Sequence, residues 1–128
     1  VVTFTLGMRS ERNPMTEANW RVFQLGEAMR EMARDKVGLK ELLHTKSLSC
    51  VLYHFPAHST DMQTAHEEDE LYYVIKGKAR LRVGEEQHVV QEGTLMYVHA
   101  ACDHAFFDIE EDLTTLAFYG TSVNARRP

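Results

Sequence analysis

The chain has 128 residues, the length of one domain, and its 44% apolar and 26% charged residues are typical of a folded globular protein. Its formal net charge of −5 comes without a basic stripe, which argues against nucleic acid as a partner. No apolar run approaches the ~20 residues that a membrane-spanning helix needs. We therefore expect a single domain that binds neither nucleic acid nor membrane.

The two cysteines, Cys50 and Cys102, are too few for a disulfide framework. The first twelve residues begin with a short apolar stretch and have no basic region before it, so they do not resemble a signal peptide. We therefore expect a cytoplasmic protein with reduced cysteines. Cys102 either borders a functional site near His104 or serves as a small buried hydrophobic residue.

The N-terminal part of the chain predicts an extension that carries one helix. Residues 20–23 resemble a short strand. Apolar residues then recur at helical spacing over 24–36, which predicts an amphipathic helix that ends before Gly38. We assign residues 1–44 to this extension.

From residue 47 onward the pattern changes to short runs rich in β-branched and aromatic residues, separated by turn residues. Several short strands at this spacing indicate an all-β barrel or sandwich. We assign residues 45–120 to the barrel and 121–128 to a C-terminal tail. The predicted strands cover 48–55, 70–75, 79–83, 87–91, 95–98, 104–109 and 113–119.

Alternation along two of these strands places polar residues on inward faces. Alternate residues of a strand share a face, so Glu70 lies on the face of Tyr72. By the same rule His104 shares a face with Phe106 and Asp108. We interpret Tyr72 and Phe106 as core or pocket-wall aromatics. A carboxylate that points inward needs a partner, because an unpaired buried charge is costly.

These inward residues and one more histidine form a candidate metal site. His66 has the same parity as Glu70, and His104 lies on the later strand. Imidazole and carboxylate hold divalent transition metals and leave positions open for substrate. If the two stretches are neighbouring strands of one barrel, His66, Glu70 and His104 converge on one point.

The stretch HEEDELYYVIKG resembles the first motif of the cupin family, whose members are small barrels of the double-stranded β-helix type. His66, Glu70 and Gly77 match that motif in register. Thr64 stands where the family has another histidine.

The stretch GTLMYVHAACDHAFFD resembles the second cupin motif, in which Gly93 and His104 match. His99, Ala101 and Asp108 replace the proline, glycine and asparagine of that motif. The resemblance spans about residues 45–120 and is similar to a subgroup of small single-domain bacterial cupins. It implies a jelly-roll-like barrel with a helix-bearing N-terminal extension.

The resemblance also implies the metal ligands. Because Thr64 removes one imidazole, the set becomes two histidines and one carboxylate, as in non-haem iron oxygenases. Gln63 could add an amide oxygen as a weak ligand if the backbone bends there. The expected cofactor is a divalent transition metal, Fe, Mn, Ni or Zn, held by His66, Glu70 and His104.

For function we expect a metal-dependent cupin enzyme that acts on a small polar molecule by dioxygenase, isomerase or lyase chemistry. The alternative is a non-catalytic module that binds a small-molecule ligand. A third interpretation is a metal-free barrel with a structural role. One fold hosts many chemistries, so the site must decide among them.

The strand over 70–75 is apolar on both faces, because Leu71, Tyr73 and Ile75 lie opposite the residues that face the site. An outer face in water should be polar, so something must cover it. The N-terminal segment or a second subunit could do so, and the resemblance favours a homodimer.

Overall fold

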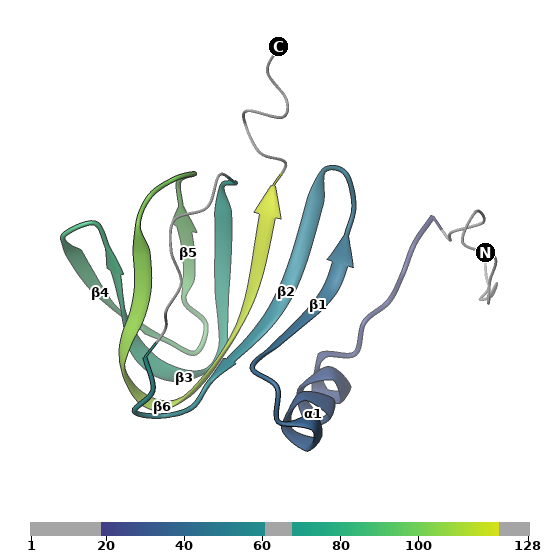
Figure 1. The fold of residues 1–128 in the computed structure, drawn as a ribbon, viewed down its shortest axis with the longest axis horizontal. Helices are drawn as coiled ribbons and strands as arrows, with labels where there is room; N and C mark the ends of the chain where they lie inside the picture. Colours follow the sequence, from purple (N-terminus) through teal and green to yellow (C-terminus); the bar gives the residue numbers. More distant parts are fainter. Residues whose placement is uncertain (1–18, 61–67, 121–128) are drawn as a thin grey trace, which may run out of the picture.

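The computed structural model describes residues 19–60 and 68–120. Its described part contains one helix and six strands, which Figure 1 shows in chain order. They are α1 (Leu25–Asp35), β1 (Leu39–His44), β2 (Leu48–Phe55), β3 (Glu70–Val83), β4 (Glu86–Gln91), β5 (Leu95–Val98) and β6 (His104–Gly120).

All strands belong to one antiparallel sheet with the order β1-β2-β6-β3-β4, and β5 pairs with β3. The two long strands pair with each other twice. The first half of β3 pairs with the second half of β6, and its second half pairs with the first half of β6 and with β4. Because both strands bend in the middle, the sheet folds over on itself into a barrel (Figure 1).

The bend in β3 lies at Gly77, where the pairing with β6 shifts register on both sides. Gly77 has φ +101°, a conformation that L side chains rarely adopt. A Cβ atom at this position would collide with the carbonyl oxygen of Asp112 on β6. The close crossing of the two strands therefore requires glycine.

Two hydrophobic cores lie on opposite faces of the sheet. The inner core fills the barrel, and its largest fully buried apolar side chains are Tyr72, Phe106, Ile109 and Leu113. The outer core lies between α1 and the outer face of β1, β2 and β6, and contains Ala28, Met32, Leu42, Cys50 and Leu52.

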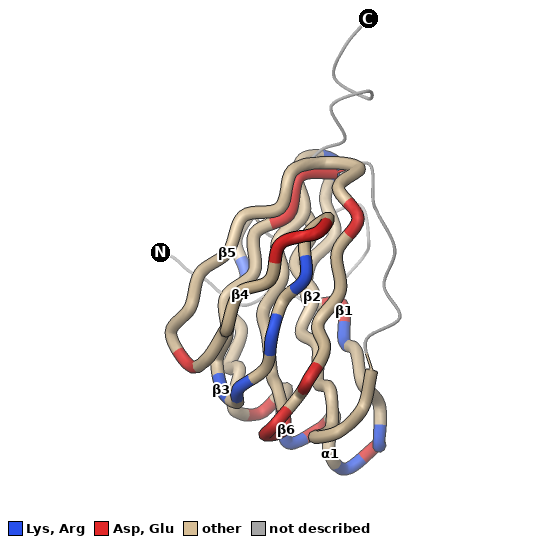
Figure 2. Tube along the Cα trace, turned by 90° about the vertical axis from the view of Figure 1, so that its left-hand side faces the viewer, with Lys and Arg blue, Asp and Glu red and all other residues tan. Residues whose placement is uncertain are grey.

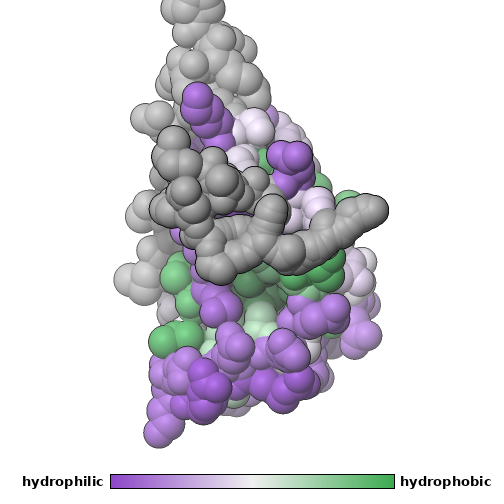
Figure 3. Space-filling model, turned by 90° about the vertical axis from the view of Figure 1, so that its right-hand side faces the viewer, coloured by the Kyte–Doolittle hydropathy of each residue, from purple (hydrophilic) through white to green (hydrophobic). Residues whose placement is uncertain are grey.

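Helix α1 covers only part of the outer face. Its apolar residues recur every three or four positions, so one side packs on the sheet and the other faces water. Figure 3 shows hydrophobic residues in the middle of this side of the molecule and hydrophilic residues below them. Beneath the helix, burial raises the pKa of the Cys50 thiol.

The helix stops at Lys36, which adopts the left-handed conformation with φ 57°. The Lys36 amide donates to the Ala33 carbonyl oxygen at 3.3 Å, and the Val37 amide donates to that of Met32 at 3.1 Å. These two bonds cap the carbonyl groups of the last turn. The expected helix over 24–36, ending before Gly38, is confirmed.

The expected all-β barrel with one N-terminal helix is also confirmed, and two strands, 48–55 and 95–98, have the predicted bounds. Four of the predicted strands merge into two continuous bent strands. Residues 70–75 and 79–83 both belong to β3, and residues 104–109 and 113–119 both belong to β6. The prediction of a short strand over residues 20–23 was wrong, because this segment forms no strand pairing.

Strand β1 was not predicted. Its sequence, LKELLH, mixes charged and apolar residues without strict alternation, and its pairing with β2 contains a register shift between Glu41 and Leu43. A bulge of this kind hides the strand period in the sequence.

In Figure 2 basic residues recur along β3, with acidic residues on the strands beside them. Of these basic residues, Lys78, Arg80 and Arg82 form ion pairs with Glu110, Asp108 and Asp103. No helix among residues 19–60 and 68–120 is long and apolar enough to cross a membrane.

We predict that Gly77→Ala lowers the free energy of unfolding by about 2–4 kcal/mol, since a strained φ and a steric collision each cost about 1–3 kcal/mol. Gly93→Ala is the matched control, because Gly93 has φ +90° but a Cβ there meets nothing within 4 Å. It should cost about 1–2 kcal/mol through strain alone. Urea denaturation measures both, and equal losses would contradict the close crossing described here.

Candidate functional site

The candidate site lies inside the barrel, where β3 and β6 begin. Glu70 is the first residue of β3 and His104 is the first of β6. In the pairing of these strands Glu70 lies opposite Tyr119, whereas His104 lies opposite Val83. Glu70 and His104 therefore lie in different halves of the bent sheet, and the folding of the sheet brings their side chains together.

Glu70 and His104 are both buried, with 2% and 0% of their surface exposed. Glu70 Oε1 and His104 Nε2 lie 3.0 Å apart. The Tyr72 hydroxyl lies between them: it donates a hydrogen bond to Glu70 Oε1 at 2.6 Å and lies 3.0 Å from His104 Nε2. These three residues form what we call the inner polar cluster.

The backbone of Cys102 orients the His104 ring. His104 Nδ1 lies 2.9 Å from the Cys102 carbonyl oxygen, which can only accept a hydrogen bond. The proton of the neutral ring is therefore on Nδ1, and the Nε2 lone pair points toward Glu70 and Tyr72. Histidines that bind metals commonly show this arrangement, with one nitrogen held by a backbone carbonyl and the other left for the metal.

The geometry of this cluster fits a divalent metal. Two ligand atoms about 2.1 Å from one ion and at right angles to each other are about 3.0 Å apart, which matches the observed separation of Glu70 Oε1 and His104 Nε2. A carboxylate oxygen and a nitrogen lone pair this close repel each other unless a proton or a cation lies between them. Among residues 19–60 and 68–120, however, no group of three His, Cys, Asp or Glu side chains is placed to hold a metal ion.

The structure thus brings together two of the expected ligands. His66 and Gln63 lie outside the described residues, as does Thr64. The expectation that Asp108 shares the inward face of His104 was wrong. Asp108 is exposed and has φ 48°, so the alternation of β6 breaks there.

Tyr72 is the residue of the candidate site that sequence reasoning missed. The sequence indicated only an inward aromatic side chain, whereas the structure places its hydroxyl in contact with both Glu70 and His104. Burial is the largest cause that raises the pKa of Tyr72, followed by the influence of Tyr119 and of the Glu70 carboxylate. The phenol therefore keeps its proton and acts as a donor in this cluster.

A second pair of hydroxyl groups adjoins the cluster. The hydroxyls of Tyr53 and Tyr119 are 2.7 Å apart. Burial is the main cause that raises the pKa of Tyr119, the Tyr53 bond raises it further, and a hydrogen bond with Tyr72 lowers it. A line of phenol groups therefore leads from Tyr53 through Tyr119 to the inner polar cluster.

This fold and site define a class: small antiparallel double-stranded β-helix barrels with an inward histidine and carboxylate at one end. Residues 51–119 match the cupin domain family over more than half of the chain. The chain belongs to the cupin family.

Relatives and solved structures agree with this assignment. An uncharacterised protein of Streptomyces coelicolor is 35% identical over 99 residues, which cover 77% of this chain and 94% of that protein. The crystal structure of a cupin from Methanocaldococcus jannaschii with a double-stranded β-helix fold is 17% identical and has a TM-score of 0.62, covering 68% of this chain and 82% of that one.

The fold is also similar to that of an enzyme, the DMSP lyase DddQ from Ruegeria pomeroyi, with 16% identity and a TM-score of 0.62. The match covers 66% of this chain, and the chain spans about half of the lyase, 47% of its length. At this identity the likeness concerns the fold alone.

We predict that Tyr72→Phe, measured without added metal, lowers the free energy of unfolding by about 1–3 kcal/mol, because it removes the donor between Glu70 and His104. Tyr53→Phe is the control, since it removes a hydroxyl whose bond at 2.7 Å involves another neutral hydroxyl. It should cost about 1 kcal/mol. A Tyr72→Phe protein as stable as wild type in thermal and urea denaturation would show that this bridge contributes nothing.

Proposed function

We propose that this cupin is a metal-dependent enzyme that acts on a small polar molecule. Glu70, His104 and His66 would hold a divalent Fe, Mn, Ni or Zn ion, with Gln63 as a weak further ligand. The observation that carries the proposal is the buried contact of 3.0 Å between Glu70 Oε1 and His104 Nε2, with the lone pair of His104 facing inward.

When bound, the metal would supply a Lewis acid at which a substrate oxygen is polarised, or a site for oxygen chemistry if it is iron. The chain's own residues provide the rest. The Cys102 carbonyl fixes the orientation of His104, and the Tyr72 hydroxyl holds a proton within reach of the site. The buried wall that includes Phe106, whose ring centroid lies 5.4 Å from that of Tyr72, excludes water.

Dioxygenase, isomerase and lyase chemistry all suit such a site, because each acts on a polar molecule bound at open metal positions. The solved structures of similar fold include an enzyme, a DMSP lyase, but a shared fold favours none of these reactions, since one fold hosts many.

One observation favours a second candidate function, a non-catalytic module that binds a small molecule. The Tyr72 hydroxyl contacts both Glu70 and His104, and a proton shared between Glu70 Oε1 and His104 Nε2 would let the three polar groups satisfy one another without an ion. Such a cluster could bind a polar ligand by hydrogen bonds alone. Metal analysis of protein purified without chelator separates the candidates, because an enzyme of the proposed kind retains near-stoichiometric metal.

We predict that Glu70→Gln weakens binding of Fe(II) or Mn(II) by about tenfold or more in anaerobic titrations, since even outer-shell partners change metal affinity about 10–100-fold. The amide keeps the size of the side chain and removes its charge, so the barrel should remain folded. Glu85→Gln, in the exposed turn between β3 and β4, is the control and should bind metal like wild type. Equal affinities of Glu70→Gln and wild type, or no binding by either, would exclude the proposed metal centre.

We also propose that two copies of the chain associate through the outer face of β3 and β5. Leu71 lies opposite Tyr97 and Tyr73 lies opposite Leu95 in this pairing, and all four side chains are exposed, Leu95 and Tyr97 by 61% each. Helix α1 packs on neighbouring residues of the sheet but leaves these four uncovered within the described structure. A contiguous apolar patch of this kind is typical of an interface.

We predict that wild type sediments as a dimer at micromolar concentration, whereas Leu95→Lys sediments as a monomer, because a charge in an apolar interface must be desolvated. Val89→Lys on β4 is the control: Val89 is 49% exposed but lies outside this patch, so the variant should remain dimeric. A monomeric wild type, or a dimer that survives Leu95→Lys, would contradict the proposed interface.

A further inference from the structure

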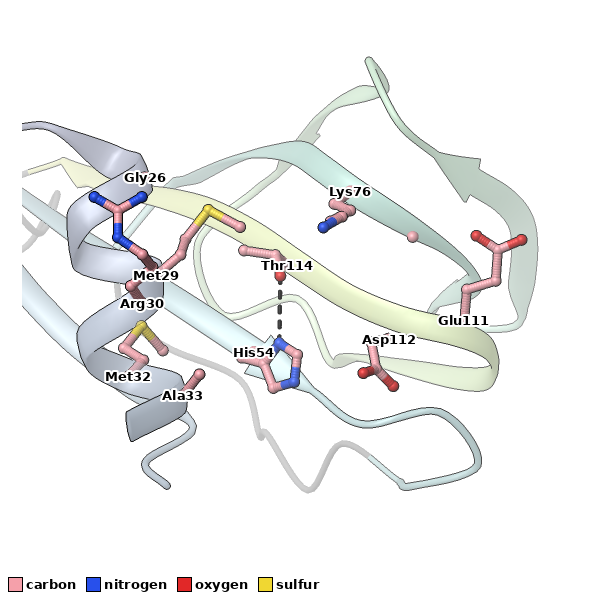
Figure 4. A pocket seen from close by; sticks show the side chains of 11 residues that line it. Gly26, Met29, Arg30, Met32, Ala33, His54, Lys76, Glu111, Asp112 and Thr114 are labelled. Carbon is pink, nitrogen blue, oxygen red and sulfur yellow. Dashed lines mark hydrogen bonds between the residues drawn. The ribbon is translucent and has the colours of Figure 1, made fainter. Parts of the chain in front are cut away.

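A second concave site lies outside the barrel, between α1 and the strands β2, β3 and β6 (Figure 4). The cavity has a volume of about 610 Å³. Met29, Met32 and Ala33 form its apolar wall on the helix side. None of the residues of the inner polar cluster lines it, so it is a separate site.

The bend of β3 directs a lysine into this cavity. Glu70, Tyr72 and Val74 point into the barrel, and unbroken alternation would also point Lys76 inward. The register shifts on both sides of Lys76, so that Ala79 is the next buried residue on the strand. Lys76 is left exposed and lines the outer cavity. Bulges of this kind commonly re-aim a side chain at a functional site.

The cavity holds two cationic side chains that have no carboxylate partner in the described part of the chain, Lys76 and Arg30. In Figure 4 the Lys76 ammonium points toward Thr114, whose hydroxyl lies 3.3 Å from His54 Nδ1. These polar groups form the floor of the cavity beside the apolar wall of the helix.

The acidic residues of the cavity lie at its other end. Glu111 and Asp112 line it where β6 crosses β3, and Asp112 Oδ1 accepts a hydrogen bond of 2.8 Å from the Ala57 amide. A ligand with one negative charge is attracted by Lys76 and Arg30, while a second negative charge near Glu111 would be repelled.

We propose that this cavity binds a small molecule with a single carboxylate and a short apolar body. The carboxylate would lie against the Lys76 ammonium, which donates to it, while Arg30 adds positive charge at the helix side of the cavity. The apolar body would pack against Met29 and Met32. An apolar cavity of roughly 300–1,000 Å³ with a few polar groups that fix orientation is the usual form of a small-molecule site.

A titration of ¹⁵N-labelled full-length protein with hexanoate, followed by amide chemical shifts, tests the proposal. Hexanol, of the same length and without charge, is the matched probe. Hexanoate should shift the amides of Met29, Ala33 and Thr114 and bind more tightly than hexanol. Lys76→Met should weaken hexanoate binding roughly three- to tenfold and leave hexanol binding unchanged, since the lost interaction is a partly exposed charge pair.

Lys78→Met is the control variant, because Lys78 lies on the same strand, does not line the cavity, and has its ammonium 3.9 Å from Glu110. Hexanoate affinity should be unchanged in it. Ala33→Leu, at an exposed helix position, should weaken both probes by filling the cavity. Equal hexanoate affinities of wild type and Lys76→Met, equal affinities for the two probes, or full binding by Ala33→Leu would each overturn the proposal.

Metal titration of Lys76→Met distinguishes this site from the inner polar cluster. The variant should bind Fe(II) or Mn(II) like wild type, because Lys76 lies on the outer face of the sheet. Loss of metal binding together with hexanoate binding would mean that the substitution disturbs the barrel as a whole, and would contradict two independent sites.

Discussion

The close crossing of β3 and β6 at Gly77 is the constraint on which the rest of the structure depends. Only a residue without Cβ can lie against the Asp112 carbonyl group in this conformation. Because the strands cross so closely, each can bend and take part in both walls of the barrel. Without the bend, Glu70 and His104 would lie at distant points of one open sheet.

The crossing also affects the free energy of the barrel interior. It encloses a carboxylate in a barrel that is otherwise largely apolar, where an unpaired charge would cost several kcal/mol. The hydroxyl of Tyr72 donates to Glu70 and offsets part of this cost, and the Cys102 carbonyl holds the His104 ring beside them. In a buried polar network of this kind, hydrogen bonds between the groups lower the free-energy cost of burying them.

Alternation along the strands was enough to predict that Glu70, Tyr72 and His104 point inward, because a two-residue period survives wherever a strand is regular. It failed at Asp108, where φ is positive, and it could not reveal that the predicted short strands join into two long ones. Both failures occur where the backbone is irregular. Glycine is the one local sign of an irregular backbone that a sequence offers, and position 108 is an aspartate.

Other features depend on contacts between distant segments and therefore lay beyond a reading of one sequence. The position of the Tyr72 hydroxyl depends on how β6 folds over β3. The outer cavity depends on where α1 rests on the sheet, which its helical period does not determine. The spacing of apolar residues predicts which side of a helix or strand is buried, but it does not predict which residues that side packs against.

Cys50 gives the outer core a chemical property of its own. Its thiol lies beneath α1, 8% exposed, and burial disfavours the thiolate that would react with an alkylating reagent. We therefore expect Cys50 to react more slowly while α1 is docked than after the helix has lifted from the sheet. When alkylation at Cys50 is distinguished from alkylation at Cys102, the other free cysteine, its rate reports on undocking of the helix from the sheet.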